Sequence, residues 1–87
     1  MEQLYMMVIE KGARYHEVGT EVIERHTEHI SRLDRRGSLA LCGPLTGHID
    51  IAGMVILKAQ SLEEAENICK ADPLITGGYA TYRLRAM

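Results

Sequence analysis

Cysteine is scarce in this sequence, with only Cys42 and Cys69 among 87 residues. The two allow at most one disulfide, and their separation excludes a CxxC redox or zinc motif. Nothing else in the sequence suggests secretion, so we expect both thiols to be reduced and buried as small apolar side chains. Small domains are commonly stabilised by disulfides, a metal or a partner chain. Of these, a partner chain is the one that this sequence favours.

Long hydrophobic runs and an excess of one charge are also lacking. The longest apolar runs, Leu4–Ile9 and Ile51–Leu57, are far shorter than the ~20 residues that span a bilayer. Ten Lys and Arg against twelve Asp and Glu leave a formal charge of −2, so no general attraction to nucleic acid is expected. The opening residues 1–3 have no basic stretch of a signal peptide. We therefore expect a cytoplasmic protein without a nucleic-acid or membrane partner.

The composition that is present is ordinary for a globular protein, with 46% hydrophobic and 25% charged residues. A length of 87 residues predicts one domain over residues 1–87. A chain of this size buries only about 60–70% of the surface that its unfolded form exposes. Its core is therefore small, which again favours a partner that adds to it.

Hydrophobic periodicity predicts six elements in the order β-α-β-β-α-β. Strands are expected at Gln3–Ile9, Ser38–Cys42, Ile49–Lys58 and Tyr79–Arg85, and helices at Arg14–Arg36 and from Ser61 to Asp72. Gly19 and Thr20 interrupt the first helical pattern, so its continuous part is expected near Thr20, with Gly37 at its end. Ser61 and Glu64 form a capping box, and Pro73 is expected to stop the second helix.

This order predicts an α+β, ferredoxin-like fold, in which two helices cover one face of a four-stranded antiparallel sheet. A strand open to water on its other face should alternate apolar and polar residues. The strands at Gln3–Ile9 and Ile49–Lys58 do not alternate, and would leave an apolar patch of a kind that monomers rarely expose. We therefore expect a homodimer in which two sheets pack face to face.

Two histidines in the first helix, His26 and His29, lie within its apolar stripe. One interpretation is that they are core histidines, each bound to a backbone carbonyl. Asp72 lies in line with the buried stripe of the second helix, where it is either a plain stop signal or a carboxylate facing the first helix. A His–Asp pair is a working acid/base unit, because the carboxylate fixes the imidazole tautomer and stabilises its charged form.

Other chemical patterns are weak. His26 and His29 stand three residues apart on one face, as some metal ligands do, but no Glu or Cys lies at a recognisable ligand spacing, so no metal is expected. Gly43-Pro44 is either a backbone opening beside a pocket or an ordinary turn. Gly53, inside a strand, indicates a bulge or a close approach to the backbone.

An ordered set of short segments resembles the YciI-like family. The segments are His29–Leu33, Gly37, Leu39, Gly43-Pro44, Gly53, Ser61–Ala65, Asp72-Pro73 and Gly77. The resemblance implies a dimeric α/β-barrel of two ferredoxin-like sheets, related to muconolactone isomerase. It also implies a His–Asp pair in a cleft, here His29 and Asp72. The chain departs from the family pattern at His26, where Arg is expected, and at Leu74, where an aromatic residue is common.

One activity known in that family is dehydrochlorination of a chlorinated hydroxyhydroquinone. We therefore hypothesise a small lyase- or isomerase-type enzyme without a cofactor, acting on a small cyclic or aromatic-derived metabolite. His29 and Asp72 would be catalytic, while His26, Gly43, Pro44 and Gly53 would bind the substrate. The alternatives are a non-catalytic module that binds a small molecule or a protein, and a metal-dependent protein with its metal on His26 and His29.

Overall fold

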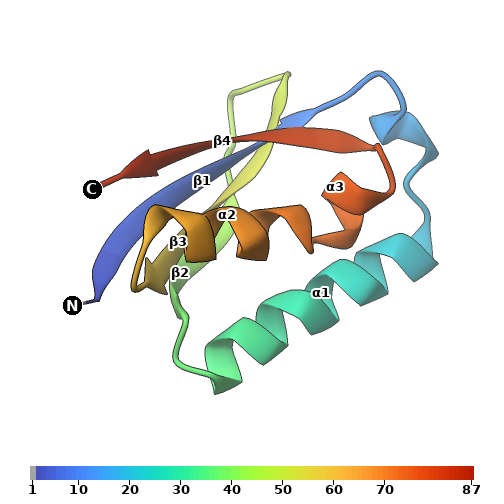
Figure 1. The fold of residues 1–87 in the computed structure, drawn as a ribbon. Helices are drawn as coiled ribbons and strands as arrows, with labels where there is room; N and C mark the ends of the chain where they lie inside the picture. Colours follow the sequence, from blue (N-terminus) through green and yellow to red (C-terminus); the bar gives the residue numbers. More distant parts are fainter. Residues whose placement is uncertain (1) are drawn as a thin grey trace.

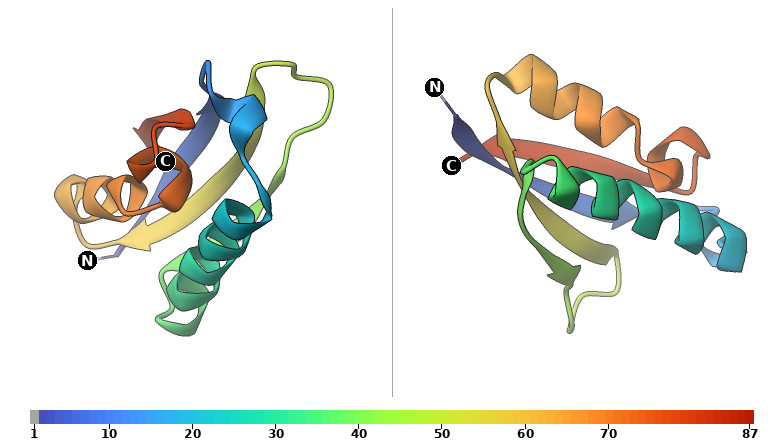
Figure 2. Two further views of the ribbon diagram at one scale, coloured as in Figure 1. Left: turned by 90° about the vertical axis from the view of Figure 1, so that its right-hand side faces the viewer. Right: turned by 90° about the horizontal axis from the view of Figure 1, so that it is seen from below.

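The computed structural model describes residues 2–87, in which four antiparallel strands form one sheet in the order β2-β3-β1-β4. The strands are β1 (Gln3–Lys11), β2 (Leu39–Pro44), β3 (Ile51–Ala59) and β4 (Ala80–Ala86). The helices lie on one face of this sheet (Figures 1 and 2). The α+β, ferredoxin-like prediction is therefore confirmed for the single chain.

Strand β1 shows why the sheet has this orientation. Tyr5, Met7 and Ile9 alternate along it and are almost completely buried under the helices. The intervening residues Leu4 and Val8 lie on the opposite face and keep part of their surface exposed. Since β1 pairs with both β3 and β4, it is a central strand whose two faces meet different surroundings.

Helix α1 (Thr20–Arg35) begins after Gly19, where the interruption was expected. The residues before it form only a short 3-10 turn, η1 (Tyr15–Glu17), so the predicted helix from Arg14 is wrong for its first turn and a half. Gly37, at φ +76°, turns the chain out of the helix, and the N–H of Ser38 bonds the carbonyl of Leu33 across this turn.

Helix α2 (Leu62–Lys70) is capped by Ser61, whose hydroxyl accepts the N–H of Glu64 at 3.1 Å. The chain then forms a second short helix, α3 (Pro73–Thr76), which the sequence analysis did not predict. Pro73 ends α2 as expected, but it also begins α3, because proline's fixed φ suits the first position of a helix.

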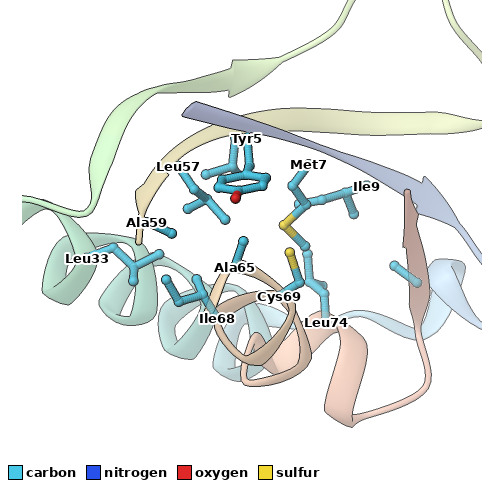
Figure 3. Close-up of a cluster of buried hydrophobic side chains, with 12 residues drawn as sticks. Tyr5, Met7, Ile9, Leu33, Leu57, Ala59, Ala65, Ile68, Cys69 and Leu74 are labelled. Carbon is cyan, nitrogen blue, oxygen red and sulfur yellow. The ribbon is translucent and has the colours of Figure 1, made fainter. Parts of the chain in front are cut away.

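The hydrophobic core lies between the helices and the sheet (Figure 3). Leu57, Ala65 and Cys69 have no exposed surface, and they bring together β3 and α2. Cys69 is thus buried as predicted. The prediction for Cys42 is wrong, because β2 is an edge strand and the thiol at this position remains exposed.

The second strand extends further than predicted, since β2 continues through Gly43 and Pro44 instead of turning there. Proline is tolerated in this place because β2 is an edge strand, where an N–H is not needed by a second neighbour. The interpretation of Gly43-Pro44 as an ordinary turn is therefore wrong. Both residues lie opposite β3, with Pro44 paired to Gly53.

The face of the sheet away from the helices is rich in apolar side chains. The register places six of them on this face: Leu4, Met6, Val8, Leu41, Met54 and Ile56. We call these six residues the apolar sheet face. Leu41 is 58% exposed and Leu4 is 39% exposed. Two arginines of β4, Arg83 and Arg85, stand opposite Val8 and Met6 at its border.

Among the helices of residues 2–87, we find none with the length and apolar character that crossing a membrane requires.

Candidate functional site

A buried carboxylate joins α1 to the segment between α2 and α3. His26 Nδ1 lies 2.9 Å from both Oδ1 and Oδ2 of Asp72. A carboxylate accepts hydrogen bonds only, so the proton lies on Nδ1 of His26. Asp72 is 1% exposed, whereas 22% of the His26 side chain is exposed. The pair thus has a buried acceptor and a partly accessible imidazole.

The carboxylate of Asp72 has a second partner in the main chain. Its Oδ1 accepts the N–H of Leu74 at 2.9 Å, which caps the first turn of α3. The Asp72-Pro73 sequence forms this cap because the residue before proline is extended and its side chain can turn toward the next free N–H. Asp72 is therefore held from both sides, and it holds the His26 ring in one orientation.

The prediction that Asp72 pairs with His29 is wrong, because the histidine that Asp72 bonds is His26. Both histidines belong to the buried side of α1, but His29 lies one turn further on, where α2 packs. Its ring there interacts with the backbone carbonyl of Ile68. Burial lowers the pKa of His29 below 6.5; nearby Asp72 opposes this change, while Arg32 and His26 add to it.

His26 also lines a small cavity of about 170 Å³ between α1 and the β2-β3 edge. Its other lining residues are Ile9, Ile30, Cys42, Gly43, Pro44, Gly53, Met54 and Val55. The structure thus brings together the four residues that were predicted to bind substrate: His26, Gly43, Pro44 and Gly53. With Nδ1 of His26 bound to Asp72, Nε2 is the ring nitrogen left for a ligand.

Gly53 allows β2 and β3 to approach closely beside this cavity. A Cβ atom at position 53 would lie 2.7 Å from the carbonyl oxygen of Gly43, far inside van der Waals contact. The pairing of β1 with β3 also shifts register directly beyond Gly53, between Ile9 and Glu10. The prediction of a bulge or a close approach at Gly53 is therefore confirmed.

Sequence reasoning missed Cys42 as a lining residue, along with the apolar walls of the cavity. Cys42 stands opposite Val55, a residue buried beneath the helices, so both side chains lie on the helix-facing side. The pairing of β2 with β3 determines this side, and no local sequence pattern shows it. Its position directly before Gly43-Pro44 was the available signal.

A second and larger cavity, of about 640 Å³, lies between α1 and α2. His29 contributes to it, together with charged residues of both signs: Arg32 of α1, Arg36 directly after α1, and Glu63 and Glu64 of α2. His29 and the His26–Asp72 pair therefore belong to different cavities. No group of three or more His, Cys, Asp or Glu side chains within residues 2–87 is arranged to hold a metal ion.

Comparison with known proteins connects this geometry to a family. The model of the YCII-related domain matches residues 3–87. The chain belongs to the YCII-related family. Within the family's range, the chain is 31% identical over 74 residues to the uncharacterized protein YjpA of Bacillus subtilis (strain 168), covering 85% of this chain and 81% of YjpA. The YciI-like resemblance predicted from the sequence is thus confirmed.

A solved structure shares the fold of this YCII-related chain. It is 5-chloro-2-hydroxyhydroquinone dehydrochlorinase (TftG) from Burkholderia phenoliruptrix AC1100, in complex with 2,5-dihydroxybenzoquinone. The TM-score is 0.67, and the match covers 94% of this chain and 90% of TftG. With 18% sequence identity, the likeness supports a common ferredoxin-like fold.

Proposed function

We propose that this chain is a small lyase- or isomerase-type enzyme in which His26 and Asp72 are the acid/base pair. One observation is central to the proposal: Asp72 holds Nδ1 of His26, and His26 lines a cavity. A buried carboxylate behind an imidazole stabilises the imidazolium that forms when the other nitrogen takes a proton. His26 thus replaces His29 in the role that the sequence analysis gave to the latter.

In the proposed reaction, Nε2 of His26 removes a proton from a ring carbon or hydroxyl of the substrate. Asp72 stabilises the charged imidazole until the proton returns to another atom, as in an isomerase, or until a leaving group departs, as in a lyase. This chemistry requires no cofactor. The substrate would lie against Gly43, Pro44 and Gly53. Because these residues have small side chains or none, the ligand could approach the backbone closely.

The cavity and the fold support a small cyclic substrate. An engineered cavity of about 150 Å³ holds one benzene molecule, so a cavity of about 170 Å³ suits a single ring. TftG, which shares the fold, is named for a chlorinated hydroxyhydroquinone and was solved with a dihydroxybenzoquinone. We therefore propose ring-derived quinols and hydroxy acids as the substrates to test first.

The test is a turnover screen with such compounds, beginning with 5-chloro-2-hydroxyhydroquinone, followed by variants of the two histidines. We expect His26→Gln to lower kcat by about 100-fold or more, since a positioned general base contributes about 10²–10⁴-fold. His29→Gln is the matched control, because His29 lies on the same helix but outside the small cavity that His26 lines. A loss of turnover in His29→Gln with full activity in His26→Gln would overturn the assignment.

The alternative is a non-catalytic module of the same shape that binds a small molecule or a protein. The observation that favours it is the hydrogen bond from the N–H of Leu74 to Asp72, because a capping carboxylate has a structural purpose of its own. In this case His26→Gln should alter ligand affinity and thermal stability, while the wild-type chain turns over none of the screened compounds.

We also propose that the chain forms a homodimer through the apolar sheet face. The helices cover the other face of the sheet, and six apolar side chains remain on this one. A second copy offers the same apolar surface, which suits the self-complementary contact of a two-fold dimer. Two sheets packed in this way would give the dimeric α/β-barrel that the family resemblance implies.

We propose a cytoplasmic location because neither cysteine forms a disulfide. Both Cys42 and Cys69 are free thiols, as is usual in a reducing compartment. Recovery of the protein in a periplasmic or secreted fraction of its source cells would contradict this.

A further inference from the structure

The small cavity beside His26 has few groups capable of chemistry. Of its nine lining residues, only His26 and Cys42 have side chains with an exchangeable proton. The remaining side chains are aliphatic, apart from Met54, whose side chain the register places on the opposite face of the sheet. Residues 43, 44 and 53 are glycine or proline. A ligand in this cavity therefore meets one imidazole and one thiol.

Cys42 is positioned by the pairing of β2 with β3. It stands opposite Val55, which is 3% exposed beneath the helices, so the thiol lies on the same side of the sheet as α1. Cys42 remains accessible to solvent and forms no disulfide. The apolar sheet face proposed for dimer contact is the opposite face, so the position of Cys42 is compatible with that dimer.

We propose that Cys42 is a nucleophilic residue of this cavity, which adds to a cyclic α,β-unsaturated carbonyl ligand with His26 as its base. The thiolate, not the thiol, is the nucleophile, and an imidazole that is held by a carboxylate is a suitable acceptor for the thiol proton. Asp72 provides this support from behind the ring. Cys42 from β2 and His26 from α1 thus line the same cavity, and Asp72 holds the His26 ring from the segment between α2 and α3.

The proposed step balances without any further reactant. The proton of Sγ moves to Nε2 of His26, and the thiolate forms a bond to the β-carbon of the ligand. The C=C π bond breaks, and its electrons give an enolate on the carbonyl side. His26 then returns the proton to the α-carbon, so the net change is addition of S–H across the double bond.

The experiment uses 2-cyclohexen-1-one, a single-ring enone, with the folded full chain. Intact-mass measurement and peptide mapping should find one adduct, located on Cys42. Cys69 is the internal control, because it is buried and its pKa is raised to about 12, mainly by burial, with Glu66 and Asp72 adding to the shift. Cys42→Ser should abolish the adduct. Labelling of Cys69 at the rate of Cys42 would overturn the proposal.

The role of His26 is tested by the rate and its pH profile. We expect His26→Gln to slow adduct formation at Cys42 by at least about tenfold and to change the pH profile, whereas His29→Gln should do neither. The guanidinium-unfolded wild-type chain gives the reference rate for a free thiol, which needs no folded variant. A wild-type Cys42 that reacts at this reference rate, with the same pH profile, would contradict the proposal.

The inference rests on the proposed function only in using the same cavity and the same histidine. Adduct formation requires no turnover, so the two proposals fail separately. Absence of turnover with a His26-dependent adduct would count against the enzyme alone. Turnover that depends on His26, together with a Cys42 that reacts as a free thiol, would count against the nucleophile alone.

Discussion

Two histidines one turn apart on α1 have different partners. His26 donates a hydrogen bond from Nδ1 to the carboxylate of Asp72, whereas the buried ring of His29 interacts with the backbone carbonyl of Ile68. Burial penalises the charged imidazole of His29, so its pKa falls below the ordinary value. Burial thus favours the neutral form of His29.

The lowered pKa of His29 predicts a loss of stability in mild acid. The unfolded chain takes up a proton at this residue near 6.5, while the folded chain resists protonation until the pH is lower. Stability from neutral His29 is therefore present above pH 6.5 and lost as the pH falls through the folded-state pKa. Urea unfolding at a series of pH values should show that His29→Gln weakens this dependence.

The matched control is His16→Gln, since the His16 side chain is 76% exposed and lies outside the core. This variant should keep the acid sensitivity of the wild-type chain. Equal pH dependence in wild type and His29→Gln would show that His29 is not the group responsible.

At the residue scale, the sequence identified the right types of side chain but not the right pair. The periodicity of α1 put His26 and His29 on its buried side, and the position of Asp72 indicated a carboxylate facing α1. Which of the two histidines reaches Asp72 depends on the position of α1 along its own axis relative to α2 and α3. Such an offset is determined by side-chain packing between helices, which no spacing within one helix reveals.

At the element scale, the edge formed by β2 and β3 is shaped by Gly53. A methyl group at this position would lie 2.7 Å from the Gly43 carbonyl oxygen, so Gly53→Ala must push the two backbones apart. We expect a loss of about 1–3 kcal/mol in the free energy of unfolding, as for other overpacked sites. Urea denaturation measures this loss directly.

Gly43→Ala is the matched control on the same edge. A Cβ atom there would meet nothing within 4 Å, and Gly43 is not among the described glycines with positive φ. Its stability should therefore stay within about 1 kcal/mol of the wild-type value. If both variants are equally stable, the close approach of the two strands does not limit the fold.

Local signals in the sequence predicted the order of the helices and strands, but not helix α3. Ser61, Gly37 and the two-faced strands gave the element order because each signal is local. Helix α3 was missed because the rule applied to Pro73 was that proline ends a helix. The same proline begins a new one when the residue before it, Asp72, supplies a cap.

At the scale of the whole molecule, the apolar sheet face predicts a dimer that one charge can break. Met6 lies in the middle of this face, opposite Ile56 and Arg85. We expect Met6→Glu to shift the chain to a monomer, because the carboxylate would lose its hydration in the apolar interface, and an ion pair with Arg85 returns only part of that cost. Size-exclusion chromatography with light scattering over a dilution series measures the mass.

Ile49→Glu is the control for this prediction, since Ile49 is an equally apolar residue that is 88% exposed in the β2-β3 loop. This variant should keep the mass of the wild-type protein. A wild-type chain that remains monomeric at high concentration would refute the dimer, and with it the argument that apolar residues on both faces of β1 and β3 require a second sheet.

The Asp72 carboxylate limits how this site can change by single substitutions. Asn at position 72 keeps an oxygen for the N–H of Leu74 but loses the charge that supports His26. Glu keeps the charge, but its extra methylene displaces the carboxylate from a cap that spans only two residues. No single replacement preserves both contacts. Changes in ligand preference are therefore expected to arise more readily at the lining residues of the small cavity than at Asp72.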